Sequence, residues 1–173
     1  MSKVYSVIAL LDEASTQAFL TLRQKLSVIE GSYNNTLPHI TISIYDKDTN
    51  LDELIQWTKK IAENQHKFKV IYKTVGFTPE GALKAIPAFS PQLYALYYNH
   101  HQKFDLYCRD YNALKNGEWL PHTGIWYTDK ETACANIGKL AEIFQPFEAE
   151  ITSLRITEFD YKLFTNIIEF KLQ

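Results

Sequence analysis

The chain repeats one short pattern in its two halves. The segment LPHITISIYDKDTN starts at Leu37, and the segment LPHTGIWYTDKETA starts at Leu120. Each segment is followed by a stretch with helical spacing of apolar residues, and then by stretches rich in β-branched and aromatic residues. Internal similarity of this kind indicates a fold built from similar units that pack together. We therefore expect a duplicated architecture in which the two repeated segments meet near a pseudo-twofold axis.

Hydrophobic periodicity extends the repeat over nearly the whole chain. Strands are expected at 4–11, 38–45, 68–77, 82–89, 147–159 and 163–170, and helices at 14–26, 51–63 and 131–144 and from Pro91 onward. No Ser/Gly-rich or Pro-rich linker separates the halves. These features predict an α+β protein with a single domain over residues 1–173, made of two pseudo-symmetric lobes at roughly 1–90 and 91–173.

Charge and cysteine content restrict the partners and the compartment. The 18 Lys and Arg residues against 20 Asp and Glu residues give a net charge of −2, whereas a grip on duplex DNA needs many cations. Cys108 and Cys134 show neither CxxC nor metal-ligand spacing, which fits a reducing compartment. The apolar run before Asp12 is too short for a membrane span and lacks a signal-peptide cleavage site. We expect a cytoplasmic monomer without duplex DNA or membrane partners.

Alternation along the two motif strands sorts their side chains onto two faces. Successive side chains in a strand point in opposite directions, and the isoleucines at 40, 42 and 44 indicate the buried face. The positions expected to face a cleft are His39, Thr41, Ser43 and Tyr45 in the first block and His122, Gly124 and Trp126 in the second. Each copy would then contribute one histidine to a shared site.

Two histidines across one cleft can work as an acid and a base. An imidazole with a pKa near 6.5 can take a proton in one role and give one in the other. In phosphodiester cleavage, one histidine activates the attacking oxygen and the other protonates the leaving oxygen. A hydroxyl two residues after each histidine can donate to the phosphoryl oxygens. This arrangement requires neither a metal nor a cofactor.

The two histidine tetrapeptides resemble the motifs of the two-histidine (2H) phosphoesterase superfamily, which includes 2′–5′ RNA ligase-like proteins and cyclic phosphodiesterases. HITI at 39–42 matches the pattern of histidine, any residue, Thr or Ser, and a hydrophobic residue, whereas HTGI at 122–125 lacks the hydroxyl. The resemblance implies a bilobal α+β fold with two antiparallel sheets lining a central groove and helices outside. It implies cleavage of 2′,3′-cyclic phosphates or 2′–5′ phosphodiesters of a nucleotide or RNA end. His39 and His122 would be the acid–base pair, and Thr41 would donate to phosphate.

Glycine at position 124 leaves three interpretations open. Thr123 faces the opposite side of a regular strand, although a β-bulge, which glycine often marks, would turn it back. Gly124 would otherwise make room for a bulkier ligand with a water in the place of the donor. The third alternative is a catalytically degenerate protein that only binds a nucleotide or an RNA end.

Other side chains are weaker candidates for ligand contacts. Tyr45 and Trp126 would stack on a base or belong to the core, and Ser43 would contact the ligand or serve as a plain polar strand residue. Arg155, Tyr161 and Lys162 would help to hold phosphate, although a solvated or turn position is the favoured interpretation for Lys162. The adjacent His100 and His101 do not share a helix face, which argues against a metal site there. A structural α+β domain with coincidental repeats is the remaining alternative.

Overall fold

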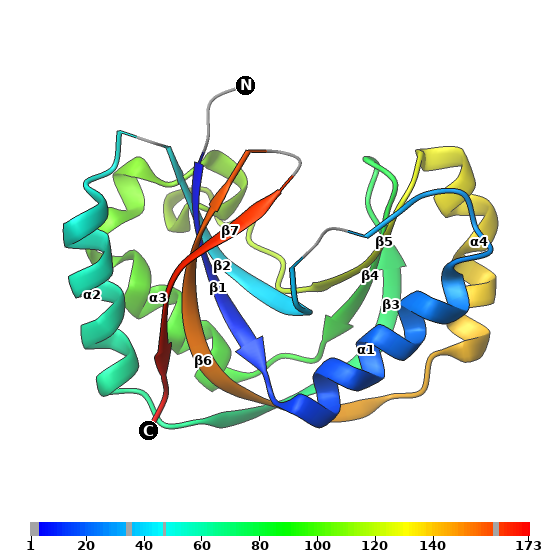
Figure 1. Ribbon diagram of the computed structural model, residues 1–173, viewed down its shortest axis with the longest axis horizontal. Helices are drawn as coiled ribbons and strands as arrows, with labels where there is room; N and C mark the ends of the chain where they lie inside the picture. Colours follow the sequence, from blue (N-terminus) through cyan, green and yellow to red (C-terminus); the bar gives the residue numbers. More distant parts are fainter. Residues whose placement is uncertain (1–3, 34–35, 47, 161–162) are drawn as a thin grey trace.

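The computed structural model describes residues 4–33, 36–46, 48–160 and 163–173, and it is an α+β structure (Figure 1). Its strands are β1 (Val4–Leu11), β2 (His39–Asp46), β3 (Phe68–Phe77), β4 (Ala82–Pro87), β5 (Thr123–Tyr127), β6 (Phe147–Phe159) and β7 (Phe164–Lys171). Its α-helices are α1 (Glu13–Leu26), α2 (Leu51–Glu63), α3 (Pro91–Phe104) and α4 (Lys130–Ile143). Short 3₁₀ turns follow α3 at Asp105–Tyr107, Asp110–Asn112 and Leu114–Asn116. The expected α+β class is confirmed.

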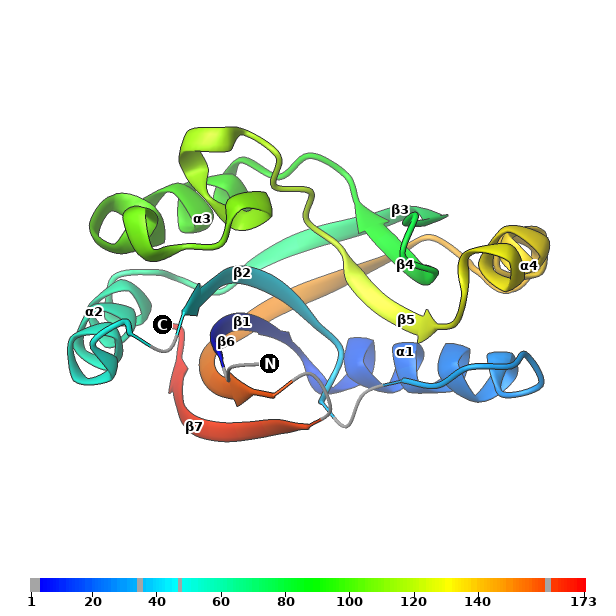
Figure 2. The same ribbon diagram turned by 90° about the horizontal axis from the view of Figure 1, so that it is seen from above.

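The strands form one continuous antiparallel sheet, where two separate sheets were expected. The strand order is β2-β1-β6-β3-β4-β5, and β7 pairs with β6. The reason is the length of β6, whose 13 residues serve both halves of the molecule. One edge of β6 pairs with β3 over Phe147–Ile151 and with β7 over Ser153–Phe159. Because β3 and β7 diverge from this shared edge, the sheet opens into two arms without dividing (Figure 2).

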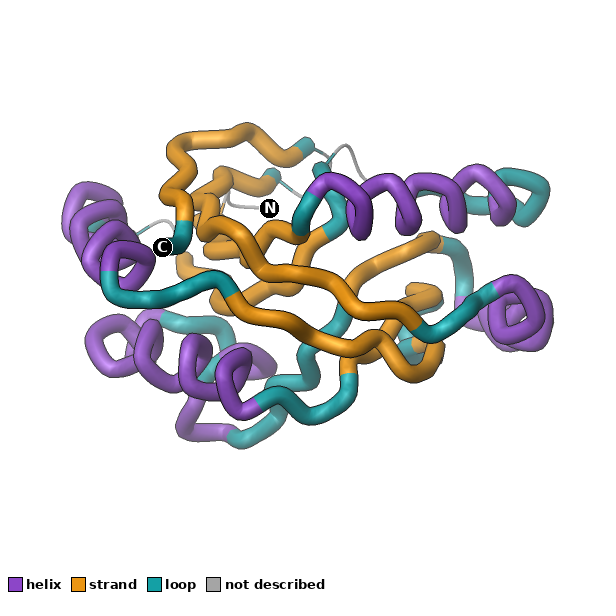
Figure 3. The backbone as a smooth tube through the Cα atoms, turned by 90° about the horizontal axis from the view of Figure 1, so that it is seen from below, coloured by secondary structure: helices purple, strands orange, loops and turns teal. Residues whose placement is uncertain are grey.

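The helices cover the outer sides of the two arms (Figure 3). Helices α2 and α3 pack together at one end, and α1 and α4 lie at the other end (Figure 1). Helix α1 comes from the first half of the chain but contacts β5 of the second half, whereas α3 of the second half contacts β2 of the first. Each half therefore supplies a helix to the motif strand of the other. The division into lobes near residue 90 stays a prediction.

Local sequence explains where the helices begin. Asp12 accepts hydrogen bonds from the Ser15 backbone N–H and hydroxyl at the start of α1, and Asp129 does the same with Thr132 at the start of α4. Such N-caps satisfy backbone donors that a first helical turn leaves unpaired. Within the described residues, none of the helices combines the length and apolar character that crossing a membrane requires.

The two motif strands lie at opposite ends of the strand order, yet they meet in space. The Thr123 hydroxyl on β5 donates a 3.0 Å hydrogen bond to the backbone carbonyl of His39 on β2. The curl of the sheet therefore brings its first and last strands together at the repeated segments (Figure 2). This contact places the two motif histidines beside one another.

Candidate active site

His39 and His122 are held by the same local turn. Nδ1 of His39 lies 2.7 Å from the Leu37 carbonyl oxygen, and Nδ1 of His122 lies 2.7 Å from the Leu120 carbonyl oxygen. A carbonyl oxygen only accepts, so Nδ1 carries the proton in both rings. Nε2, on the far side of each ring, is left to accept or release a proton. The repeated Leu-Pro-His sequence thus produces two equivalent imidazoles.

Both imidazoles favour the neutral form in the ligand-free protein. Burial lowers the pKa of His39 to about 4, and the charges of Arg23, His122 and Arg155 add to this effect against the hydrogen bond to Leu37. Burial and the nearby Lys84 ammonium likewise lower the pKa of His122 to about 4. Because a positive environment disfavours a further cation, the same groups favour an anion in the space between the rings.

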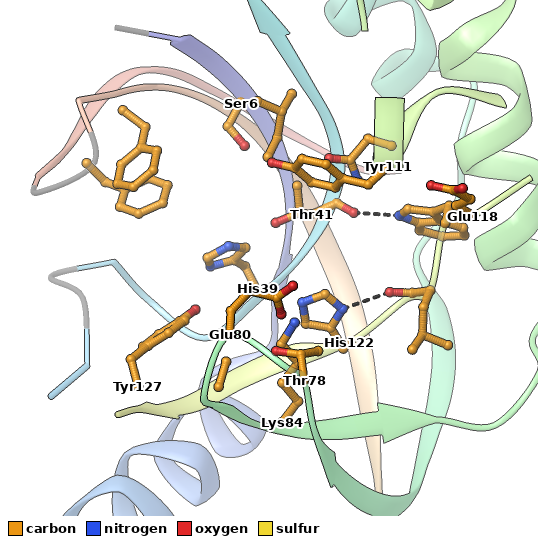
Figure 4. A pocket seen from close by; sticks show the side chains of 17 residues that line it. Ser6, His39, Thr41, Thr78, Glu80, Lys84, Tyr111, Glu118, His122 and Tyr127 are labelled. Carbon is orange, nitrogen blue, oxygen red and sulfur yellow. Dashed lines mark hydrogen bonds between the residues drawn. The ribbon is translucent and has the colours of Figure 1, made fainter. Parts of the chain in front are cut away.

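A groove with a volume of about 580 Å³ contains the two histidines and Thr41 (Figure 4). The other polar side chains that line it include Ser6, Thr78, Glu80, Lys84, Tyr111, Asn112, Glu118 and Tyr127. Rings of Trp119, Phe159 and Phe164 complete much of the wall, and the Phe164 ring centroid lies 6.0 Å from that of His39. Within the described residues, no group of three or more His, Cys, Asp or Glu side chains is arranged to hold a metal ion.

A β-bulge at Ile42 changes which residues of β2 face the groove. Val7 of β1 pairs with Ser43 while the next residue of β1 pairs with Thr41, so Ile42 is an extra residue. Beyond the bulge the alternation is reversed, and Ile44 lines the groove. Ser43 and Tyr45 are fully buried on the other side, which corrects the expectation that they face the ligand.

Tyr45 is part of a buried polar cluster under α3. Its hydroxyl lies 3.1 Å from Nδ1 of His100, and Nε2 of His100 lies 3.1 Å from the Thr58 hydroxyl. Burial lowers the pKa of His100 to about 3, so this imidazole is neutral and structural. The neighbouring His101 is also buried, and its Nε2 lies 3.1 Å from the Ile42 carbonyl oxygen. His101 therefore supports the bulge of the first motif strand.

The second motif strand has the same irregularity at the equivalent position. Leu83 of β4 pairs with Trp126 while the next residue pairs with Gly124, so Ile125 is the extra residue. Trp126 is thereby turned into the core, at 4% exposure, and Tyr127 lines the groove. Both outcomes differ from the expected alternation, because a bulge reverses the side-chain order beyond it.

Thr123 lies before this second bulge and stays on the buried face. It is fully buried, and its hydroxyl is hydrogen-bonded to the Tyr72 hydroxyl as well as to the His39 carbonyl. Thr123 therefore joins the two motif strands and does not supply the hydroxyl that position 124 lacks. The backbone carbonyl of Gly124 accepts a 3.1 Å hydrogen bond from the guanidinium of the buried Arg23.

Comparison with solved structures places this arrangement in a known fold. The chain matches TT0787 of Thermus thermophilus (TM-score 0.69, 14% identity, 98% of this chain and 97% of that chain). It matches a phosphoesterase (TM-score 0.70, 12% identity, 100% and 99%) and apo LigT of E. coli (TM-score 0.65, 12% identity, 100% and 99%). The chain has the LigT fold. No protein-family model and no curated protein sequence matches it.

Two cations near the histidines of this groove have different surroundings. Arg155 donates to Glu169 at 2.6 Å and does not line the groove, so its contribution is electrostatic rather than the phosphate contact expected for it. Lys84, next to Gly124 across the β4–β5 pair, does line the groove, and burial lowers its pKa. Tyr161 and Lys162 lie outside the described residues.

Sequence reasoning missed Lys84 and Tyr127, which both lie in the groove wall. Lys84 falls in a predicted strand without any motif, and only the β4–β5 pairing places it beside the second histidine. A regular strand that exposes His122, Gly124 and Trp126 to the cleft would place Tyr127 on the opposite, buried face. The one available signal was Gly124, since glycine inside a strand often marks a bulge.

Proposed function

We propose that the chain is a metal-independent phosphodiesterase of the two-histidine type, acting on a 2′,3′-cyclic phosphate or a 2′–5′ phosphodiester of a nucleotide or RNA end. The observation that carries the proposal is the pair of identically held imidazoles in one groove. Each has its Nδ1 proton committed to a backbone carbonyl. The two Nε2 atoms are therefore matched for complementary proton transfers.

In the proposed reaction, one histidine accepts a proton and the other donates one. One neutral imidazole takes a proton from water as the water oxygen attacks phosphorus. The P–O bond to the leaving ribose oxygen breaks, and the second histidine, in its protonated form, gives its Nε2 proton to that oxygen. The Thr41 hydroxyl donates to a phosphoryl oxygen while negative charge builds on it. Transfer of the proton gained by the base to the other ring restores the starting state.

The electrostatics of the groove support anion binding coupled to proton uptake. Arg23, Arg155 and Lys84 help burial to hold the histidine pKa values at about 4 when no anion is present. A bound phosphodiester carries a negative charge close to both rings, and an opposite charge raises the pKa of a histidine. Substrate binding therefore supplies the protonated histidine that the leaving oxygen needs.

The size and lining of the groove support a nucleotide-sized ligand. A volume of about 580 Å³ is typical of small-molecule sites, and aromatic rings such as Trp119 and Phe164 offer faces for a base. LigT, which shares the fold at 12–13% identity, has been solved in complex with 3′-AMP and with phosphate. These complexes support a nucleotide ligand for the present groove.

The test is turnover of 2′,3′-cyclic nucleotides and 2′–5′ linked dinucleotides in the presence of EDTA. Wild type should hydrolyse at least one member, and His39→Ala and His122→Ala should each abolish that hydrolysis. The exposed His66, between α2 and β3, provides a matched control, and His66→Ala should keep full activity. Activity that survives the loss of both motif histidines would exclude the proposed mechanism.

Binding without catalysis is the second candidate function, and Gly124 is the observation that favours it. In other enzymes, removal of one hydrogen-bond donor to a developing oxyanion lowers the rate about a hundred- to a thousand-fold. A protein that lacks the motif hydroxyl would bind the same nucleotides and turn them over very slowly. Calorimetric binding of a 2′,3′-cyclic nucleotide with no product after prolonged incubation would favour this second function.

A further inference from the structure

The space beside Gly124 is occupied by the side chain of Tyr127. A Cβ atom added to Gly124 would lie 3.1 Å from Cζ of the Tyr127 ring and closer still to the Tyr127 hydroxyl oxygen. No side chain at position 124 can coexist with Tyr127 in this position. The hydroxyl of Tyr127 therefore occupies space that the side chain of a threonine or serine at position 124 would need.

The two motif strands are equivalent in this region, which makes the comparison direct. Each has a bulge at the residue that ends its tetrapeptide, Ile42 in β2 and Ile125 in β5. As a result, the residue five positions after each histidine lines the groove, and these residues are Ile44 and Tyr127. In the first strand, the hydroxyl is at Thr41 and the residue three positions later, Ile44, is apolar. In the second strand, Gly124 has no side chain and the residue three positions later, Tyr127, has the hydroxyl.

The backbone of Tyr127 is held on both edges, so the phenol projects from a well-defined position. On one edge Tyr127 pairs with Ala82 of β4. On the other edge its N–H and carbonyl form hydrogen bonds of 2.7 and 2.8 Å with Ser32. Gly31, at φ 139°, allows this approach, because a Cβ there would collide with the Tyr127 carbonyl and lie 2.7 Å from the Trp126 indole nitrogen. The ring lies against Gly124. Its hydroxyl points into the groove (Figure 4).

We propose that the Tyr127 hydroxyl replaces the missing hydroxyl of the second motif and donates a hydrogen bond to a phosphoryl oxygen of the ligand. The proposal rests on the proposed function, since it assigns a role within the same site. It makes Tyr127 a ligand-contacting residue opposite Thr41. It also explains why position 124 is a glycine, because only glycine leaves room for the phenol. The second motif is then complete, with its hydroxyl supplied from three residues further along the chain.

The first test removes the hydroxyl and keeps the ring. Tyr127→Phe should lower kcat/KM for the substrate found in the panel about a hundred- to a thousand-fold. It should weaken calorimetric binding of 2′,3′-cyclic AMP about tenfold or more, because a hydrogen bond to a charged group is lost. Tyr98→Phe, on the exposed surface of α3, is the matched control and should match wild type in both measurements. Unchanged binding and turnover in Tyr127→Phe would overturn the proposal.

The second test moves the hydroxyl back to its usual position. The double variant Gly124→Thr/Tyr127→Ile copies the arrangement of the first block, with threonine two residues and isoleucine five residues after the histidine. It should regain most of the activity that Tyr127→Phe loses, whereas Gly124→Thr alone should lose activity because the new side chain and the phenol collide and neither hydroxyl keeps its position. A double variant with wild-type thermal stability and the low activity of Tyr127→Phe would contradict the proposal that a hydroxyl at position 124 can replace that of Tyr127.

The two readouts separate this proposal from the proposed function. If wild type binds 2′,3′-cyclic AMP without turning over any panel member and Tyr127→Phe binds it more weakly, the phosphodiesterase function fails and the role of Tyr127 stands. If hydrolysis depends on both histidines but is equal in wild type and Tyr127→Phe, the function stands and the role of Tyr127 fails. If wild type neither binds 2′,3′-cyclic AMP nor hydrolyses any panel member, both proposals are overturned.

Discussion

The neutral state of the partly buried motif histidines predicts a specific loss of stability in mild acid. Burial lowers the pKa of both His39 and His122 to about 4, whereas the unfolded chain holds its histidines near 6.5. Between these values the unfolded state binds more protons than the folded state. The free energy of unfolding must therefore decrease as the pH falls from 6.5 toward 4, and the contribution is fully present above pH 6.5.

The magnitude follows from the pKa difference. One pKa unit corresponds to about 1.4 kcal/mol. Lowering the pH from 7 to 5 should therefore decrease the free energy of unfolding by about 2 kcal/mol for each of these histidines. The pair together then costs about 4 kcal/mol, a large part of the typical stability of a domain, about 5–15 kcal/mol. The variant His122→Gln cannot take up this proton. It should lose about 2 kcal/mol less than wild type between pH 7 and 5.

Urea denaturation at pH 7, 6 and 5 measures this difference. Carboxylates with lowered pKa values, such as Asp12, Asp105 and Glu169, also contribute on acidification, but they do so equally in wild type and variant. The exposed His66 serves as the control, and His66→Gln should show the wild-type dependence. Parallel pH dependences for wild type and His122→Gln would refute the claim that His122 is neutral in the folded protein.

Two further predictions concern the groups around the histidines. Lys84→Met removes a neighbouring cation, so the pKa of His122 should rise toward its usual range in an NMR titration while inorganic phosphate binds more weakly. His101→Leu leaves the buried carbonyl of Ile42 without its partner, which should lower the free energy of unfolding by about 1–3 kcal/mol in urea denaturation and reduce turnover by disturbing the bulge beside Thr41. If His101→Leu keeps wild-type stability and turnover, the bulge holds its shape without His101.

The repeated Leu-Pro-His blocks were sufficient to predict the α+β class, most elements and a pairing of His39 with His122 in one site. This worked because each block is local: proline, a histidine ring and a carbonyl two residues earlier form the same turn in both copies. Helix starts were predictable for the same reason, since capping involves residues only three positions apart. Such local structures can be predicted from sequence because the residues that form them are close neighbours along the chain.

The faces of the motif strands beyond Ile42 and Ile125 were decided by tertiary structure. A period-two pattern predicts direction only along a regular strand, and one extra residue reverses it. Whether a residue is extra depends on the pairing of β2 with β1 and of β5 with β4, and His101 and Arg23 from distant helices support the same segments. No local signal contains those pairings. Sequence alone therefore predicted which two histidines line one groove, whereas the folded sheet decided that Tyr127 and Lys84 line it with them and that Tyr45 and Trp126 belong to the core.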